Sequence, residues 1–348
     1  MLLIKLISFT VFVLFPALLC ATPSINSISG TFSGGETVTI SGSGFGSKSP
    51  AAPLIWDDFE DGAIDTSTTA LDRDDWDSIG SGWDDVDNTV KHAGTYSAKG
   101  DAGAGNCNAC INGSYGDGVK VYVYLWRRYA STVSCNQKFF RMYPSETYPN
   151  WAWSWHNDGI TIVEPNVWTT HGCCGSPPEG NTWYNEEFEL QMSSGSAQAD
   201  GIGRYYSNCT KESEFTDVVT RNGSYPDQFT RLYIDNYGEQ TGYVWEDDIY
   251  IDTTWSRVMV GDNATFTSCT HREIQIPSVW ADGEITITFN QGSFSTDDTA
   301  YVFVVDSNGD TCSGACGEEI TIGGTSSPPQ ITGLTIRGGP LSEIPPEF

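Results

Sequence analysis

The chain has 348 residues, of which 17 are Lys or Arg and 45 are Asp or Glu, and its formal net charge is −28. A negative surplus of this size repels a phosphate backbone, and no basic run offsets it locally, so nucleic acid is excluded as a partner. Aromatic residues make up 13% of the chain and charged residues only 18%, so the chain can bury a sizeable core and is expected to fold.

Residues 1–21 have the pattern of an export signal. Lys5 provides a positive start, a largely apolar run extends from Leu6 to Leu19, and Ala21 is a small residue at a plausible cleavage point. No later window approaches the roughly twenty apolar residues that a transmembrane helix needs. We therefore expect a secreted protein, extracellular or at the cell surface, with no transmembrane segment.

The first segment after the signal predicts two strands and a glycine turn. In SINSISGTFSGGETVTISGSGFG, which follows Pro23, isoleucines precede the Gly34-Gly35 pair and Val38 and Ile40 alternate after it. This segment resembles the opening of an IPT/TIG domain, an immunoglobulin-like β-sandwich of extracellular proteins. It covers less than half of such a domain, and the alternating segments between residues 256 and 324 have the order of the remainder.

We therefore predict an all-β protein in which one domain interrupts another. Residues 22–50 and 256–325 form a split TIG-like β-sandwich, and residues 51–255 form a jelly-roll β-sandwich inserted in its first loop. Such insertions are tolerated where the ends of the inserted domain lie close together at the surface. Almost no stretch of the chain shows helical periodicity, which favours the same fold class.

The inserted segment opens with WDDFEDG, continues through HAGTYSAKG and closes with GYVWEDDIYID. These three pieces resemble the jelly rolls of carbohydrate-binding modules and concanavalin-like lectins, many of which hold a structural calcium ion. The resemblance implies a Ca²⁺ site at Glu60, Asp61 and Asp248, and Ca²⁺ prefers hard oxygens of this kind. Residues 57–87 are strongly acidic, so a solvated acidic loop is the alternative.

Alternation along the inserted strands predicts one dry face and one aromatic and polar face, because residues two apart share a side of a strand. In KVYVYLWRR, Val121, Val123 and Leu125 form the aliphatic side, and FELQM and TRLYIDNY show the same split. Aromatic rings stack on sugar rings while polar groups bond the hydroxyls, so the second face favours a polysaccharide or surface glycan as partner. The expected glycan contacts are Tyr122, Tyr124, Trp126, Trp151, Trp153, Trp155, Arg231 and Tyr233, and the alternative for the three Trp of NWAWSWHND is the core between the sheets.

Catalytic signals in the insert are weak. The E-x-D-x-x-E strand of jelly-roll glucanases and a Ser or Cys nucleophile elbow are both absent. A polysaccharide lyase needs a Tyr or His base and a cation that neutralises a uronate carboxylate, for which Arg141, His156, Arg204 and Tyr205 are candidates. The sequence favours a secreted, non-catalytic glycan-binding protein of the cell surface or matrix, with a uronate-specific polysaccharide lyase as the alternative.

Nine cysteines follow the signal in a compartment where disulfides persist. Two short local bridges are expected, Cys107–Cys110 and Cys312–Cys316, and the pairing of the other five stays open. A zinc site at Cys107 and Cys110 would need a second ligand pair that the sequence does not offer at suitable spacing. Four sequons, at Asn112, Asn208, Asn222 and Asn263, predict surface positions that carry glycans if the source organism glycosylates its proteins.

Residues 326–348 hold a Pro-rich linker and a short apolar strand, ITGLTIRGG. A lone apolar strand outside a folded unit must pair with another strand. It either returns to its own TIG-like sandwich or adds to a neighbouring subunit, which would make the protein a fibre subunit that self-associates through its C-terminal strand.

Overall fold

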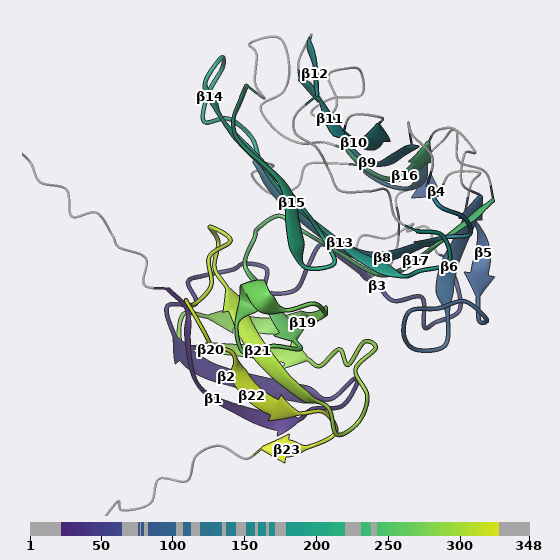
Figure 1. Ribbon diagram of the computed structural model, residues 1–348. Helices are drawn as coiled ribbons and strands as arrows, with labels where there is room; N and C mark the ends of the chain where they lie inside the picture. The colour runs from purple at the N-terminus through teal and green to yellow at the C-terminus, as the bar shows by residue number, and fades with distance from the viewer. Residues whose placement is uncertain are drawn as a thin grey trace, which may run out of the picture.

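The computed structural model describes residues 22–64, 76, 78–79, 83–101, 107–112, 119–133, 137–143, 151–156, 159–164, 167–170, 179–219, 231–237 and 242–326. These residues form antiparallel β-strands and one short 3-10 helix, η1 (Phe266–Ser268), so the predicted all-β class is confirmed. Figure 1 shows two lobes, and in the lower one the N-terminal strands lie beside strands from the C-terminal part of the described chain.

The lower lobe, here called the host sandwich, is one sheet of eight strands in the order β22-β21-β18-β19-β20-β2-β1-β23. The two chain segments meet where β2 pairs with β20, with Val38 opposite Ile287 and Ile40 opposite Ile285. The strands are β1 (Ser24–Thr31), β2 (Thr37–Ser43), β18 (Arg257–Gly261), β19 (Arg272–Ala281), β20 (Glu284–Thr288), β21 (Thr299–Val305), β22 (Glu318–Thr321) and β23 (Thr325–Ser326).

Strand β19 lets this sheet close into a sandwich. Its first half pairs with β18 and its second half with β20, and the register shifts between Pro277 and Val279. A bulge bends the strand that carries it, so the two halves of the sheet face each other across a core. Ile28, Val38 and Ile40 lie in that core, as their alternation predicts.

The upper lobe is the inserted jelly roll, which has two sheets. The sheet that faces the host sandwich has the order β15-β14-β13-β8-β17-β6-β5, with β3 also paired to β17. Its strands are β3 (Ile55–Asp57), β5 (Trp83–Asp87), β6 (Ser97–Asp101), β8 (Lys120–Tyr129), β13 (Tyr184–Gln191), β14 (Ala199–Ser207), β15 (Thr210–Val219) and β17 (Tyr243–Asp252). We call it the host-facing sheet.

The second sheet, here called the outer sheet, lies on the side away from the host sandwich (Figure 1). Its order is β12-β11-β10-β9-β16-β7-β4. The strands are β4 (Ser78–Ile79), β7 (Cys107–Asn112), β9 (Gln137–Tyr143), β10 (Trp151–His156), β11 (Gly159–Glu164), β12 (Val167–Thr170) and β16 (Arg231–Tyr237).

The core of the jelly roll lies between these two sheets and contains the predicted aliphatic faces. Val121, Val123 and Leu125 of β8 pack in one buried cluster with Phe188 and Leu190 of β13. Leu232 and Ile234 of the outer sheet join the same cluster. Alternation along these strands therefore predicted correctly which residues face the core.

The ends of the insert lie side by side, as an insertion into a loop requires. Entry strand β3 pairs with exit strand β17, with Ile55 opposite Ile251. At the same crossing, Lys48 Nζ lies 2.5 Å from Asp252 Oδ2, and their side chains are only 1% and 5% exposed. This buried ion pair ties the two connections between host and insert together.

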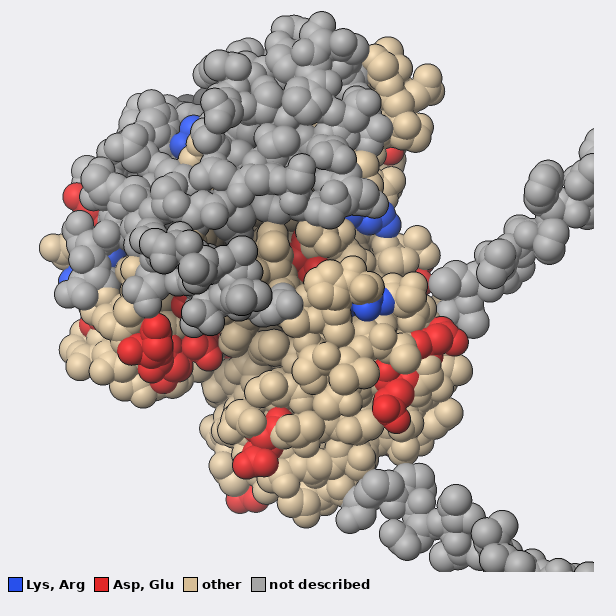
Figure 2. All heavy atoms as spheres, turned by 180° about the vertical axis from the view of Figure 1, so that it is seen from behind, with Lys and Arg blue, Asp and Glu red and all other residues tan. Residues whose placement is uncertain are grey.

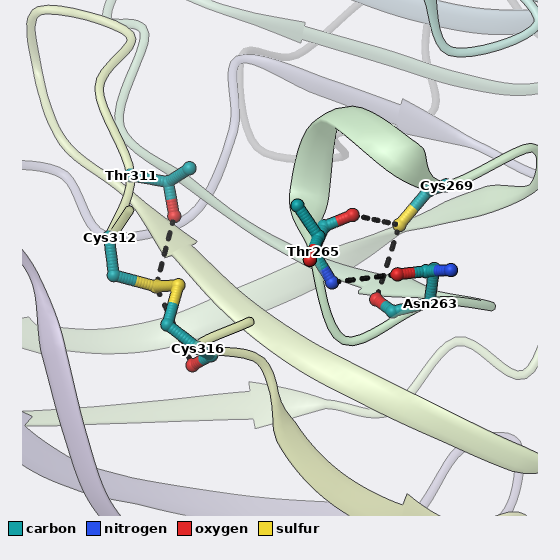
Figure 3. The surroundings of a disulfide bond; sticks show 6 residues. All are labelled: Asn263, Thr265, Cys269, Thr311, Cys312 and Cys316. Carbon is teal, nitrogen blue, oxygen red and sulfur yellow. Dashed lines mark hydrogen bonds between the residues drawn. A yellow bond between two sulfur atoms is a disulfide. The ribbon is translucent and has the colours of Figure 1, made fainter. Parts of the chain in front are cut away.

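The disulfide prediction is confirmed at one of its two positions. Cys312 and Cys316 form a disulfide in the host sandwich, near the short 3-10 helix η1, which Cys269 follows (Figure 3). Cys107 and Cys110 both lie in strand β7. The side chains of both residues lie outside the described part of the structure, so this second bridge stays a prediction.

Two further cysteines, Cys209 of the insert and Cys269 of the host, are buried and free. They lie in one apolar cluster with Phe303. Burial raises the pKa of the Cys209 thiol to about 12 and raises that of Cys269 as well. Both residues are therefore held in the thiol form, which reacts more slowly than the thiolate.

Several predictions concern residues on which the structure bears only in part. Asn208 and Asn263 are exposed, as glycosylation requires, and Asn112 lies in β7. Asn222, the export signal and the C-terminal strand lie outside the described residues. Within the described residues, no helix is long and apolar enough to cross a membrane.

Candidate functional site

The aromatic and polar face of the host-facing sheet is covered by the host sandwich. Tyr122, Tyr124 and Trp126 are 0%, 0% and 7% exposed. They pack in one buried cluster with residues of the host and its connection, namely Trp255, Met259, Ile274 and Val305. The prediction that these three rings contact a glycan is therefore wrong, because alternation shows which residues share a face and not what covers it.

The other predicted glycan contacts lie on the outer sheet. Tyr233 is half-buried, and the guanidinium of Arg141 lies 5.2 Å from the centre of its ring. The side chains of Arg231, Trp151, Trp153 and Trp155 lie outside the described residues. Glycan contact on this sheet stays a prediction.

The candidate lyase residues do not form one site. Arg204 and Tyr205 are neighbours in β14 and point to opposite faces: Tyr205 lies in the core and donates to Glu186 Oε1 at 3.0 Å, whereas Arg204 pairs with Glu189 at 2.9 Å on the host side. Arg141 lies on the other sheet, and the side chain of His156 lies outside the described residues. The structure therefore contradicts this group as a catalytic site.

A buried ion network joins the insert to the host. Glu187 Oε1 of the insert lies 2.6 Å from Arg272 Nη2 of the host, and Glu187 Oε2 accepts from Tyr122 Oη at 2.9 Å. Arg257 Nη2 lies 2.9 Å from Glu189 Oε1 and 3.4 Å from Glu187 Oε2. Burial alone would raise the pKa of Glu187, but Arg272 and Arg257 more than offset it and hold the pKa below its ordinary value.

A second polar cluster lies between the same two domains. Glu273 Oε1 of the host lies 2.9 Å from Nε2 of His92, which belongs to the insert, and 2.6 Å from Nε2 of His271. Its other oxygen accepts hydrogen bonds from Tyr124 Oη at 2.9 Å and Trp126 Nε1 at 3.0 Å. Glu273 is fully buried, and although burial would raise its pKa, the charge and hydrogen bonds of the two histidines lower it.

Beside this cluster, a pocket of about 600 Å³ opens between insert and host. The insert contributes four carboxylates to its wall, and the host contributes two side-chain amides and an aromatic ring. Its lining includes Trp56, Asp58, Glu60, Asp247 and Asp248 from the insert and Phe289, Asn290, Gln291 and Gly292 from the host. We call this space the interdomain pocket.

Two buried polar atoms of pocket-lining residues have no hydrogen-bond partner among the described residues: Asp248 Oδ2, an acceptor, and Asn290 Nδ2, a donor. Asp248 has a positive φ of 52° and lies where the β17 register shifts between Asp247 and Tyr250, so a bulge turns its side chain out of the ladder. Burial raises the pKa of Asp248 well above its ordinary range, and the nearby charges of Asp247 and Glu273 raise it further.

The predicted calcium ligands are brought together only in part. Glu60 and Asp248 line the interdomain pocket, whereas Asp61 is exposed and its Oδ1 accepts from the Ala63 N–H at 3.0 Å. Glu60 Oε1 accepts from the N–H groups of Thr95 and Tyr96 at 2.7 and 2.9 Å, so it holds the turn near Gly94 directly. Within the described residues these three side chains do not form a group at ligand distance, and calcium binding here stays a prediction.

The surface of the molecule carries the charge imbalance of the sequence. Figure 2 shows several acidic patches over the host sandwich and the insert, with smaller and more scattered basic areas among the described residues. An acidic surface of this kind disfavours an acidic polysaccharide as ligand unless a cation bridges the two.

The fold is that of a split immunoglobulin-like sandwich that carries an inserted jelly roll, and comparison with known proteins agrees with this class. The model of the IPT/TIG domain family matches residues 23–69, which confirms the resemblance of the first strands. No curated protein matches the sequence.

Solved structures similar to this chain are jelly-roll proteins that act on carbohydrates or are linked to them. An endo-β-1,4-glucuronan lyase from the fungus Trichoderma reesei has a TM-score of 0.43 and 13% identity over 58% of this chain and 96% of its own. The cellulose induced protein Cip1 has a TM-score of 0.36 and 19% identity, with 57% of this chain and 97% of its own covered. The alginate lyase Aly36B has a TM-score of 0.37 and 12% identity, with 58% of this chain and 98% of its own covered.

Sequence reasoning missed most of the residues that line this interface. His92 lies in the HAGTYSAKG segment of the inserted domain, whereas His271 and Glu273 lie in the second segment of the TIG-like sandwich. Half of the four histidines of the chain meet at this point. The small number of histidines is the one signal in the sequence that points to these residues. The positions of His92 and His271 along the chain do not show that their side chains meet.

Proposed function

We propose that this protein is a secreted, non-catalytic glycan-binding protein whose ligand occupies the interdomain pocket. The observation that carries the proposal is a pair of buried polar atoms without a hydrogen-bond partner among the described residues, Asp248 Oδ2 of the insert and Asn290 Nδ2 of the host, in two residues that line the pocket. A sugar hydroxyl both donates and accepts hydrogen bonds, so neighbouring hydroxyls of one glycan suit both atoms. Each atom left unsatisfied costs about 1–3 kcal/mol.

The rest of the pocket has the composition that a sugar site needs. Its volume of about 600 Å³ is of the size that holds small ligands. Trp56 and Phe289 offer apolar rings, while Gln291 and the carboxylates offer polar groups. Because four carboxylates line one wall, we propose a neutral glycan rather than a uronate polymer.

We further propose that a Ca²⁺ ion draws the carboxylates of Asp58, Asp247 and Asp248 together at this wall, since among the described residues their oxygen atoms do not all lie within 4.8 Å of one another. Burial raises the pKa of each of these carboxyls, with Asp58 the least enclosed of the three. Several carboxylate oxygens and one unpartnered acceptor form a hard, anionic donor set, which fits Ca²⁺. When bound, the ion would supply the positive charge that this wall lacks.

Assembly through the C-terminal strand also stays a proposal. Strand β1 lies at the edge of the host sheet and is covered by β23 only at Gly30 and Thr31. Of the described residues, none pairs with the outer edge of β1 before Gly30, so this edge offers a place for an added strand, from the same chain or from another.

Calcium is expected to raise the melting temperature of the mature protein, and a strong chelator is expected to reverse this rise. The ion binds the folded state alone and therefore stabilises it by mass action, by about 2.7 kcal/mol at a hundred-fold excess over its Kd. Asp248→Asn should melt at the same temperature with calcium or chelator. Asp61→Asn is the matched control and should respond like wild type, because Asp61 lies outside the pocket lining. The same melting temperature for wild type in calcium and in chelator would contradict the proposed binding of Ca²⁺.

Titration calorimetry with neutral and acidic oligosaccharides tests the glycan. We expect a neutral oligosaccharide such as cellohexaose or xylohexaose to bind, and Asn290→Ala to weaken it about ten-fold because one buried hydrogen bond is lost. Gln198→Ala removes an exposed amide outside the pocket lining and should bind like wild type. Release of ultraviolet-absorbing unsaturated uronates from an acidic oligosaccharide would instead establish a lyase.

A further inference from the structure

We propose that His92, His271 and Glu273 form a binding site for a zinc-like transition-metal ion that joins the host sandwich to the inserted jelly roll. This site is distinct from the oxygen-lined wall of the interdomain pocket and does not depend on the proposed function.

The three ligand residues come from both domains. His92 belongs to the loop between β5 and β6 of the insert, whereas in the host His271 immediately precedes β19 and Glu273 is its second residue. Their ligand atoms all lie within 4.8 Å of one another, and no other group of three His, Cys, Asp or Glu residues in the described part of the chain does so. Host and insert must therefore be docked for the three to meet.

Surrounding side chains hold each ligand in place. Tyr124 Oη and Trp126 Nε1 bond Glu273 Oε2, so Oε1 is left to face the histidines. The ring of His92 stacks on Trp126 at 3.8 Å, and the ring of His271 stacks on Phe294 at 4.2 Å. Such outer partners orient metal ligands and raise the affinity of the site.

The spacing of the ligands suits a metal after a small adjustment. Zinc lies about 2.0–2.2 Å from nitrogen and carboxylate ligands, which places tetrahedral ligand atoms about 3.3 Å apart. The two His–Glu distances are 2.9 and 2.6 Å, so the cluster would widen by about half an ångström. Ser293 Oγ lies 3.1 Å from His271 Nε2 and 3.3 Å from Glu273 Oε1, beside the position of a fourth ligand.

The site is enclosed on one side and open on the other. The side chains of Glu273 and His92 are 0% and 5% exposed, whereas that of His271 is 24% exposed and gives an entry path. Gly292 has a φ of +53°, and a Cβ atom there would meet the carboxyl group of Glu273. Glycine at this position lets the host backbone close over the cluster.

Ligand chemistry separates this site from calcium and from a catalytic triad. Two imidazoles and one carboxylate favour zinc and related metals, whereas Ca²⁺ takes oxygen ligands. In a Ser-His-acid triad, the histidine uses opposite ring nitrogens for the acid and the serine. Here Nε2 of His271 faces both Ser293 Oγ and Glu273 Oε1, so the arrangement is not a triad.

Zinc binding to the chelator-stripped mature protein tests the proposal. Competition against a chromophoric chelator should show one tightly bound Zn²⁺ per chain, and Co²⁺ in its place should give the intense visible absorption of a four-coordinate site. His271→Ala should weaken Zn²⁺ binding at least ten-fold and abolish the Co²⁺ band. Because His271 is partly exposed, this variant is expected to fold, and its melting temperature without metal should stay near that of wild type.

Two control variants separate the alternatives. His156→Ala removes a histidine of the outer sheet and should bind Zn²⁺ like wild type. Asp58→Asn alters the oxygen-lined wall and should also leave Zn²⁺ affinity unchanged, whereas Glu273→Gln should weaken it about as much as His271→Ala. Absence of a tight zinc equivalent in wild type, or tight binding that persists in His271→Ala, would overturn the site.

Discussion

Replacement of Glu187 with alanine is expected to lower the free energy of unfolding by about 3–5 kcal/mol, the cost of breaking a buried ion pair by removing one partner. Glu187 is fully buried and contacts Arg272 at 2.6 Å and Arg257 at 3.4 Å, both from the host sandwich. Without this carboxylate, Arg272 loses its ion-pair partner while still buried, and Tyr122 loses the acceptor for its hydroxyl.

Urea unfolding of the mature protein, followed by tryptophan fluorescence, measures this effect. Because the network joins host and insert, the variant should also unfold less cooperatively, with two transitions where wild type shows one. Glu214→Ala is the control, since its carboxylate pairs with Arg204 and Lys211 at 2.6 Å each but is 33% exposed. That change should cost no more than about 1 kcal/mol. Equal losses in the two variants would show that the interface network does not stabilise the docking of the domains.

Replacement of Arg127 with methionine is expected to cost a similar amount, about 3–5 kcal/mol near neutral pH. Arg127 lies on the core face of β8, where its guanidinium pairs with Glu186 and, at 2.8 Å, with Glu246. All three side chains are fully buried. Methionine fills the space of the stem but leaves two carboxyl groups in the core without their cation.

The loss of stability in Arg127→Met should be larger at high pH than at low pH. Burial raises the pKa of Glu186 from its ordinary 4.5 to about 7, against the opposing effects of Arg127 and the Tyr205 hydrogen bond. Between these values the folded protein binds a proton that the unfolded chain has released, so this group makes stability fall as pH rises from 4.5 to 7. Arg127 lowers the pKa of Glu186, so its removal strengthens this dependence. The variant should therefore lose less stability, relative to wild type, at pH 5 than at pH 8.

Urea unfolding of Arg127→Met and wild type at both pH values measures the difference. Glu186→Gln is the matched control, because the amide keeps the shape of the side chain and cannot titrate. It should remove the contribution of this group to the pH slope. A loss in Arg127→Met that is the same at both pH values would contradict the charge argument and leave only packing as the cause.

Much of the fold could be predicted because its signals are local. The period of two in KVYVYLWRR placed Val121, Val123 and Leu125 on one face, and these residues lie in the core. The glycine turn and the alternation of Val38 and Ile40 identified the first strands of the host, which pair with β20 from the far end of the chain. Strand pattern and turn chemistry depend on a few neighbouring residues, so a sequence shows them directly.

The candidate site was predicted less well, because each error concerned a contact between distant segments. Tyr122 and Tyr124 have the pattern of a sugar-binding face, yet the host sandwich covers them. Asp61 has the motif position of a calcium ligand, yet it turns toward its own loop.

The sequence by itself determined that this protein is all-β, that strands from both ends of the described chain belong to one immunoglobulin-like sandwich, and which side of β8, β13 and β16 faces the core. Tertiary structure alone decided what lies against the other side. Docking of host and insert converted an aromatic and charged face into a buried interface, opened a carboxylate-lined pocket at its margin, and brought His92 to His271 and Glu273. The physical reason is that residues within a strand are placed by backbone geometry, whereas residues 181 apart in the chain meet only through the packing of whole sheets.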